Sequence, residues 1–286
     1  RELLRALLRF SLDGPRAVEA ATAAARAAQL CWACAELRAH RREAMQLMSH
    51  FAEQWEDVSS FQGVDLVTAI RLAWASLACG SAEGEVRALL GSVGEADAEE
   101  LLPRLTPADL QPARQLAWHC RQQVGASIGG WVTALLAQGP GPALAGTTSG
   151  ARRALVGDGA SSGSGRAASA PPPEQQLSGL LQQMRVPHVV ASPAAVPGGI
   201  YRVSIWFPQP RAVLDVDSGV DRLASGALGG AAELRRRQLR AAGLEVHTFD
   251  SLTLRSPSRA EQLRAVAEAV AGSCPEAAAW LSGPEA

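Results

Sequence analysis

A stretch dominated by Gly, Ser, Ala and Pro interrupts this chain of 286 residues and limits how it can fold. The stretch covers residues 139–173 and has the sequence GPGPALAGTTSGARRALVGDGASSGSGRAASAPPP. It holds too few large apolar side chains to offset the entropy that is lost when a chain becomes ordered. We therefore expect a flexible, mostly disordered linker over residues 137–173, with a folded part on either side.

Residues 1–136 carry the periodicity of α-helices. Four apolar residues follow the spacing of one buried helix face, namely Val67, Ile70, Trp74 and Leu77. Thr106, Pro107 and Asp109 form a helix-start signal: a capping hydroxyl, a proline in the first turn and an acid near the positive end of the helix dipole. Pro112 also suits the first turn of a helix, so the sequence does not fix the residue at which that helix begins. No segment alternates like a strand, so we expect helices throughout this part.

Three segments of the helical part have similar sequences. They are QLCWA at residues 29–33, RLAWA at 71–75 and QLAWH at 115–119, and their tryptophans lie 42 and 44 residues apart. A second apolar stretch follows each segment, with Met45, Leu47 and Met48, then Val86, Leu89 and Leu90, then Trp131, Val132 and Leu135. Helix pairs with a period near forty residues are typical of an α-solenoid. The alternative is coincidence in an Ala- and Leu-rich chain, and the third copy is weaker because Arg121 stands where the second has Leu77.

The spacing and the L-x-W centre of these segments resemble the octotricopeptide repeats of green-algal organelle proteins. The motif of that family centres on an L-W-A-L-like helix, and the copies in this chain are degenerate and carry insertions. The resemblance implies an array of helical repeats over residues 1–136.

The part after the linker changes to a mixture of helices and strands. β-Branched and aromatic residues alternate at 200–207, and the segment 212–217 is short and apolar enough for a central strand. Gly243 caps one helix, and Ser258 with Glu261 forms a capping box at the start of another. The expected elements are a helix at 174–184, an extended piece at 186–190, strands at 200–207, 212–217 and 244–249, and helices at 231–242 and 258–271. This pattern predicts a small α/β unit over residues 174–271, followed by a tail at 272–286.

Five segments of this unit resemble the RAP domain family in order and spacing across about a hundred residues. They are RVPH at 185–188, YRVSI at 201–205, VLDVDSG at 213–219, LRRRQL at 234–239 and GLEV at 243–246. The resemblance implies a degenerate restriction-endonuclease-like α/β fold. It also implies a role on organellar RNA, because RAP domains accompany helical repeats in FAST-kinase-like proteins and in the algal repeat proteins.

The same resemblance argues against nuclease activity. Ser204 stands where the family has an acid in the first strand, and Asp215 stands where it usually has Glu in the second. A nuclease of this fold needs carboxylates from both strands to hold a divalent metal, and a Lys to polarise the attacking water. All 27 basic residues of this chain are Arg, so that Lys is absent. Asp215 and Asp217 share one side of a strand and form at most a weak metal pair.

The densest basic cluster lies in the expected helix 231–242 and consists of Arg235, Arg236, Arg237 and Arg240. Guanidinium groups that share a helix face bind phosphates bidentately, which predicts an RNA-binding site. The alternative is a solvated helix face whose positive charge Glu233 partly balances.

The net charge of −1 averages an acidic part and a basic part. Residues 1–136 hold 13 Arg and 16 acids, whereas residues 174–271 hold 11 Arg and 9 acids. Only the basic part suits a polyanion.

The other reactive residues show no catalytic pattern. Cys31 and Cys34 form a C-x-x-C without a second ligand pair for zinc, so we interpret them as buried helix cysteines. The histidines His119, His188 and His247 have no Ser or Cys partner in a nucleophile motif, and the chain has no phosphate loop and no dinucleotide fingerprint. We expect no enzyme activity, no cofactor and no metal.

These features predict an organellar RNA-binding protein of the mitochondrial matrix or chloroplast stroma. It would act in the processing, stability, ribosomal RNA maturation or translation of organelle transcripts, with single-stranded RNA and other ribonucleoprotein subunits as partners. The alternative is a protein-binding helical scaffold with little RNA contact, and a RAP-derived endonuclease is a third and weaker hypothesis.

No run approaches the roughly 18 apolar residues of a membrane helix, so we expect no membrane contact. Because the first residue is Arg1, we expect a fragment or a mature form.

Overall fold

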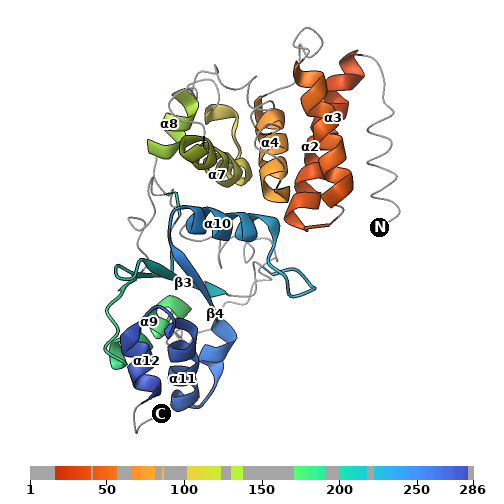
Figure 1. The fold of residues 1–286 in the computed structure, drawn as a ribbon. Helices are drawn as coiled ribbons and strands as arrows, with labels where there is room; N and C mark the ends of the chain where they lie inside the picture. The colour runs from red at the N-terminus through yellow and green to blue at the C-terminus, as the bar shows by residue number, and fades with distance from the viewer. Residues whose placement is uncertain are drawn as a thin grey trace, which may run out of the picture. The chain divides into compact units, whose positions relative to one another are not determined.

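In the computed structural model, the chain forms two compact units, which are helix-rich and include one small mixed sheet (Figure 1). One unit comprises residues 1–139 with 223–235, and the other comprises 140–222 with 236–286. The residues that the structure describes are 17–39, 41–56, 66–80, 86, 102–123, 130–137, 171–190, 200–201, 203–217 and 222–282. Most of the expected linker therefore lies outside the described residues.

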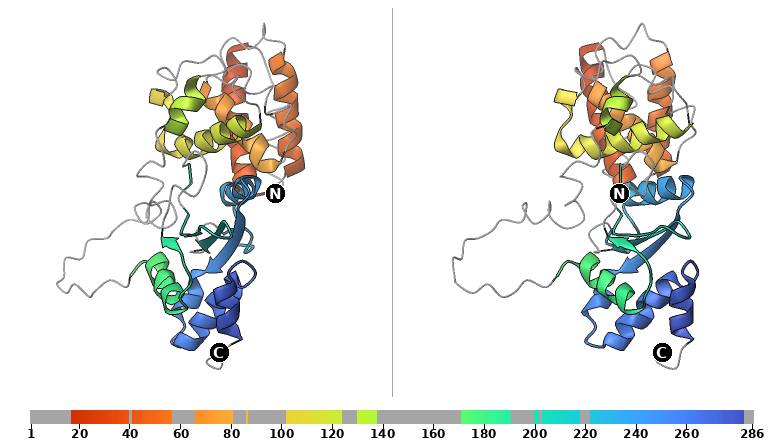
Figure 2. Two further views of the ribbon diagram at one scale, coloured as in Figure 1. Left: turned by 60° about the vertical axis from the view of Figure 1, so that its left-hand side comes forward. Right: turned by 90° about the vertical axis from the view of Figure 1, so that its left-hand side faces the viewer.

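Every element that the structure describes between residues 17 and 137 is helical, which confirms the prediction for this part of the chain. The helices are α2 (Ala17–Glu36), α3 (Arg41–Glu56), α4 (Leu66–Cys79), α7 (Pro107–Gln123) and α8 (Gly130–Ala137), with a 3₁₀ turn η1 (Leu102–Arg104). Helix α2 packs against α3 and α4, α4 packs against α7, and α7 packs against α8 (Figure 2). The core side chains include the fully buried Leu47, Met48, Leu116 and Leu135.

The three similar segments lie in α2, α4 and α7, and the tryptophans of the first two segments make contacts from one helix to the next. The rings of Trp32 and Trp74 meet edge to face, with their centroids 6.3 Å apart. The guanidinium of Arg71 lies 5.9 Å from the centre of the Trp32 ring. The indole N–H of Trp74 donates to the side-chain oxygen of Gln115 at 2.7 Å. Arg71 and Gln115 occupy equivalent positions, three residues before the tryptophan of their own segment, so each contacts the tryptophan of the preceding segment.

The start of α7 differs in detail from the expected cap. The helix begins at Pro107, as the helix-start signal predicts, and Pro112 lies inside it. The Thr106 hydroxyl donates to the Asp109 carboxylate at 2.5 Å, and the Thr106 backbone N–H donates to the same carboxylate at 3.2 Å. The carboxylate, rather than the hydroxyl, is therefore the capping acceptor, because its position in the first turn lets it reach back to the preceding backbone.

Residues 223–235 belong to the helical unit. The backbone N–H of Ala231 donates to the Glu36 carboxylate at 3.2 Å, and the Gln115 amide donates to the Ala231 carbonyl at 3.3 Å. This segment includes the start of helix α10 (Gly230–Ala241).

The second unit contains a four-stranded sheet in the order β1-β2-β3-β4. The strands are β1 (Val189–Val190), β2 (Ile205–Phe207), β3 (Ala212–Asp217) and β4 (Glu245–Asp250). β1, β2 and β3 pair antiparallel, whereas β3 and β4 pair parallel, with Ala212 opposite Glu245 and Asp217 opposite Asp250. Antiparallel strands need only a tight turn between them, but a parallel pair needs a crossover, and α10 lies in that connection.

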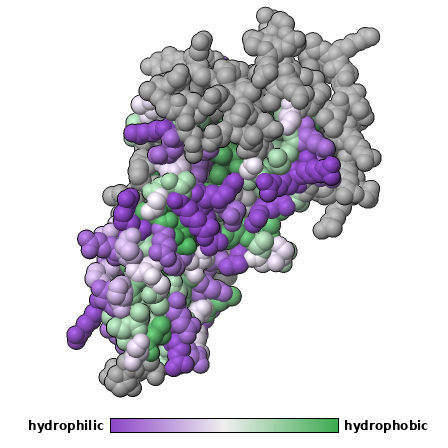
Figure 3. Space-filling model, viewed as in Figure 1, coloured by the Kyte–Doolittle hydropathy of each residue, from purple (hydrophilic) through white to green (hydrophobic). Residues whose placement is uncertain are grey.

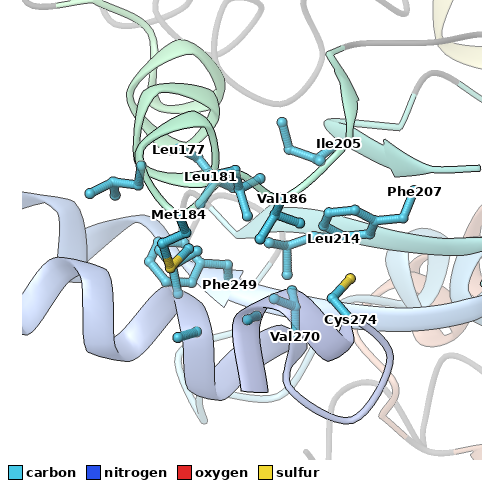
Figure 4. Packing of buried hydrophobic residues seen from close by; sticks show 14 of the residues in the cluster. Leu177, Leu181, Met184, Val186, Ile205, Phe207, Leu214, Phe249, Val270 and Cys274 are labelled. Atoms are coloured by element: carbon cyan, nitrogen blue, oxygen red, sulfur yellow. The ribbon is translucent and has the colours of Figure 1, made fainter. Parts of the chain in front are cut away.

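One face of the sheet carries the main core of this unit (Figure 4). Phe207, Leu214 and Phe249 point from three strands toward helices α9 (Pro173–Gln183) and α11 (Arg259–Val270). Side chains alternate along a strand, so Val213, Asp215 and Asp217 lie on the opposite face, to which Arg236 reaches from α10. Both faces of β3 are buried, which agrees with the short apolar segment that located this strand at its observed ends. Strand β4 was located within one residue of its ends.

Two expected elements need correction. The strand at 200–207 is shorter, because only Ile205–Phe207 pairs with a neighbouring strand, while Ile200, Tyr201 and Val203 are buried outside the ladder. The region 272–286 is more than a tail: helix α12 (Pro275–Leu281) packs on α11, and Ala277 belongs to the same core.

The capping box at α11 is only half formed. Ser258 caps α11 by accepting from the Glu261 backbone N–H at 3.3 Å, as expected. The Glu261 carboxylate accepts from the Ser256 hydroxyl at 2.6 Å instead of reaching back to the N–H of Ser258.

Candidate nucleic-acid interface

The candidate arginines lie along α10, which forms because Leu234 and Leu239 supply buried apolar positions between charged ones. The helix ends before Gly243, whose φ of +77° lies in the left-handed region that favours glycine after a helix. Arg235, Arg236 and Arg237 are half-buried, and only Arg240 is exposed. Hydrophilic residues are prominent where α10 lies on the face drawn in Figure 3. The cluster is therefore placed on one helix, but its members differ in how far solvent reaches them.

Arg236 forms a hydrogen bond within the protein. Its guanidinium donates to the Thr248 hydroxyl of β4 at 2.8 Å, so this side chain points toward the sheet. Arg235 and Arg237 also interact with neighbouring groups of the protein. An arginine that fastens a helix to a strand has fewer free donors for a phosphate, because a guanidinium has five N–H groups in a fixed plane.

The two aspartates of β3 lie on the α10 face of the sheet. Asp217 is buried and forms an ion pair with Arg222, while Asp215 is half-buried. Ser204 directs its hydroxyl oxygen to the backbone, where it accepts from the Val216 N–H at 3.3 Å. Because Arg222 already neutralises Asp217, the pair offers little to a metal ion. No group of three metal-binding side chains occurs among the residues that the structure describes.

Comparison with the models of known protein families gave no match, and no curated protein matches the chain significantly. Among the helices that the structure describes, none has the length and apolar character of a membrane span.

Two histidines have serine partners that the sequence analysis missed. The Ser178 hydroxyl lies 2.8 Å from Nε2 of His188, and Nδ1 of His188 lies 2.8 Å from the Val186 carbonyl oxygen. That carbonyl can only accept, so Nδ1 carries a proton, and in the neutral ring Nε2 accepts from the Ser178 hydroxyl. Ser178 is buried in α9, so the contact fastens the chain after α9 to this helix.

His247 makes a comparable contact on β4. Its Nε2 lies 2.7 Å from the Ser273 hydroxyl and 3.2 Å from the Glu245 carboxylate. Because one nitrogen faces both groups, the arrangement differs from a relay in which a base and its orienting acid use opposite ring nitrogens. The contact joins β4 to the turn before α12. Neither pair was visible in the sequence, since the serines lie 10 and 26 residues from their histidines.

The C-x-x-C of α2 lies inside the helical unit. Cys31 and Cys34 are both buried free thiols, as the sequence analysis predicts, and the Cys31 thiol lies 3.9 Å from the Ala44 carbonyl oxygen. Burial raises the pKa of Cys34 to about 11, and the nearby Cys79 and Glu43 act in the same direction. A reactive thiol needs a lowered pKa, so this environment opposes redox or nucleophilic chemistry.

Proposed function

We propose that the chain is an organellar RNA-binding protein that joins an array of helical repeats to a RAP-like α/β domain. The observation that carries the proposal is the order of elements in the second unit. A helix, antiparallel strands, a crossover helix, a parallel strand and a further helix follow one another along the chain, and the five segments that resemble the family lie in or beside these elements. The proposed fold of this domain is the restriction-endonuclease-like one.

The contacts of the tryptophans support the repeat part of the proposal. Arg71 lies over the ring of Trp32, and Gln115 accepts from the indole N–H of Trp74, so residues at equivalent positions each contact the tryptophan of the preceding segment. Coincidental similarity in an Ala-rich chain gives no reason for such a correspondence, whereas stacked repeats require it.

In this proposal the domain with α10 contacts single-stranded RNA, and the helical array contributes RNA or protein contacts. The process is the processing, stability, ribosomal RNA maturation or translation of transcripts in the mitochondrial matrix or chloroplast stroma. No cofactor is needed, because the arginines supply the positive charge. We do not propose an enzyme, since Arg222 holds Asp217 and the chain lacks Lys.

The test is the affinity of the full chain for single-stranded RNA between 20 and 200 mM salt, measured by fluorescence anisotropy. Binding through about three phosphates is expected to give a log–log salt slope of about −2, because each contact releases counterions. Replacement of all four α10 arginines with Ala is expected to lower the affinity at least tenfold. Arg236→Ala alone shows how much of that loss comes from the arginine that also contacts Thr248. Absence of affinity at the lowest salt would contradict the proposal.

The second candidate is a protein-binding scaffold, and the half-burial of three of the four α10 arginines favours it. A scaffold would show no salt-dependent RNA affinity, but it would retain its protein partners after nuclease treatment of a cell extract.

A further inference from the structure

The two ends of the parallel pair β3–β4 differ in charge. At the end where both strands finish, Asp217 lies opposite Asp250. At the end where both strands begin, Arg211 directly precedes Ala212, and Arg240 lies in the last turn of α10, just before β4. Arg222 neutralises Asp217, which leaves Asp250 as the uncompensated acid at the first end among the described residues. At the second end the two arginines outnumber the acid Glu245, so a polyanion is attracted to this end rather than to the first.

The backbone brings Arg211 and Arg240 to the same end of the sheet. The N–H of Glu245, the first residue of β4, donates to the Arg211 carbonyl at 3.2 Å. The Gly243 N–H donates to the Arg240 carbonyl at 2.9 Å, which closes α10 two residues before β4 begins. Both side chains are exposed, and within the described part of the chain neither forms an ion pair or a side-chain hydrogen bond. They differ in this respect from Arg236, which is held by Thr248.

An aromatic side chain lies on the sheet face next to this end. Trp206 pairs with Val213, and Val213 pairs with Val246, so all three share the face to which Arg236 reaches from α10. Trp206 is partly exposed, and its partner on the edge strand, Val189, is 45% exposed. A partly open indole is a surface on which a nucleic-acid base can stack.

We propose that a single-stranded RNA segment binds at the end of the sheet where β3 and β4 begin. Arg211 and Arg240 hold phosphates, and Trp206 stacks on a base. Arginine suits this role because its planar group binds phosphate oxygens with two hydrogen bonds. The inference rests on the proposed function and moves the principal contact from the half-buried arginines of α10 to the turn between β2 and β3.

The experiment compares two double charge reversals in the full chain. Arg211→Glu with Arg240→Glu is expected to lower the affinity for a single-stranded RNA at least tenfold and to reduce the salt slope by about 1.4. The matched control is Arg255→Glu with Arg264→Glu, which changes the net charge equally at two exposed arginines on η4 (Ser251–Arg255) and α11. The control is expected to lower the affinity less than threefold.

Trp206 is tested by two replacements. Trp206→Leu is expected to weaken binding about fivefold or more, whereas Trp206→Phe keeps an aromatic ring and is expected to remain within about threefold of the original affinity. Circular dichroism and thermal melting check the fold of every variant. If Trp206→Leu does not fold, the affinity of Trp206→Phe is used to judge whether an aromatic ring at this position supports binding.

The outcomes separate the two proposals. If the unaltered chain has no affinity for RNA, the proposed function fails. If it binds RNA but the Arg211 and Arg240 reversal has no effect, or no more effect than the control pair, the proposed site is wrong while the function stands.

Discussion

Replacing Asp109 with Ala is expected to lower the free energy of unfolding of the helical unit by about 3 kcal/mol at pH 7. The Asp109 carboxylate accepts two hydrogen bonds from Arg71, at 2.7 and 3.0 Å, and also accepts from Thr106. The side chain of Asp109 is 1% exposed and that of Arg71 is 23% exposed, so the change leaves a largely desolvated guanidinium without this carboxylate. Partial exposure of Arg71 keeps the loss at the lower end of the range for buried pairs.

The same pair predicts a pH dependence. Burial acts to raise the pKa of Asp109, but the hydrogen bonds from Arg71 and Thr106 and the charge of Arg71 outweigh it, so the pKa lies below its ordinary value. A carboxyl whose pKa is lowered by folding stabilises the folded state fully above its unfolded pKa of about 4 and loses that contribution as the pH falls through its folded pKa. The difference between the original chain and Asp109→Ala should therefore shrink only below about pH 4.

Hydrogen exchange of peptides from α4 and α7 measures this effect in the full chain, because it follows the helical unit separately from the other one. Glu268→Ala removes an exposed acid from α11 and is the control, with an expected change within about 0.5 kcal/mol. Equal protection of α4 and α7 in Asp109→Ala and in the original chain would show that the pair does not stabilise the unit.

Replacing Trp74 with Ala is expected to cost about 3 to 5 kcal/mol, because the side chain is fully buried and its removal leaves a cavity. Trp74→Phe fills part of that space but loses the N–H that donates to Gln115. Gln115 is itself buried, so its oxygen is left without this donor, and the expected cost is about 1 to 3 kcal/mol.

A double-mutant cycle isolates the hydrogen bond. Gln115→Leu combined with Trp74→Phe removes both partners and is expected to be less destabilising than the sum of the two single changes, by about 1 kcal/mol. The cycle subtracts the loss of the other Gln115 hydrogen bond, to the Ala231 carbonyl, because Gln115→Leu removes that bond in both backgrounds. Strict additivity in urea unfolding would mean that the contact contributes packing alone.

The elements that could be predicted from the sequence are those whose signal is local. Strand β3 was located at 212–217 because the segment is short and apolar enough for a central strand, and α11 was located by the Ser258 cap. The strand at 200–207 was extended too far because Ile200, Tyr201 and Val203 have the composition of a strand. Burial accounts for that composition, and Tyr201 uses its hydroxyl on Gln238 rather than pairing in the sheet.

The contacts of the candidate site depend on partners that are distant in the sequence. Arg236 could be recognised as basic, but its bond to Thr248 joins a helix to a strand beyond the next turn. The pairing of Arg71 with Asp109 spans 38 residues. Spacing along one chain gives a charge pattern, whereas the three-dimensional fold decides which of those charges remain available to a ligand.

All five cysteines of the chain are buried, so their reaction with a thiol reagent can be used to follow the unfolding of the protein. Burial raises the pKa of Cys274 to about 11 and that of Cys120 to about 12, so neither is a thiolate in the folded state at neutral pH. A thiol reagent then reacts only when a unit opens, and Cys120 marks the helical unit while Cys274 marks the sheet unit. Mass spectrometry of the labelled peptides would measure the rate at which each unit opens in the same sample, and no cysteine has to be introduced by mutation.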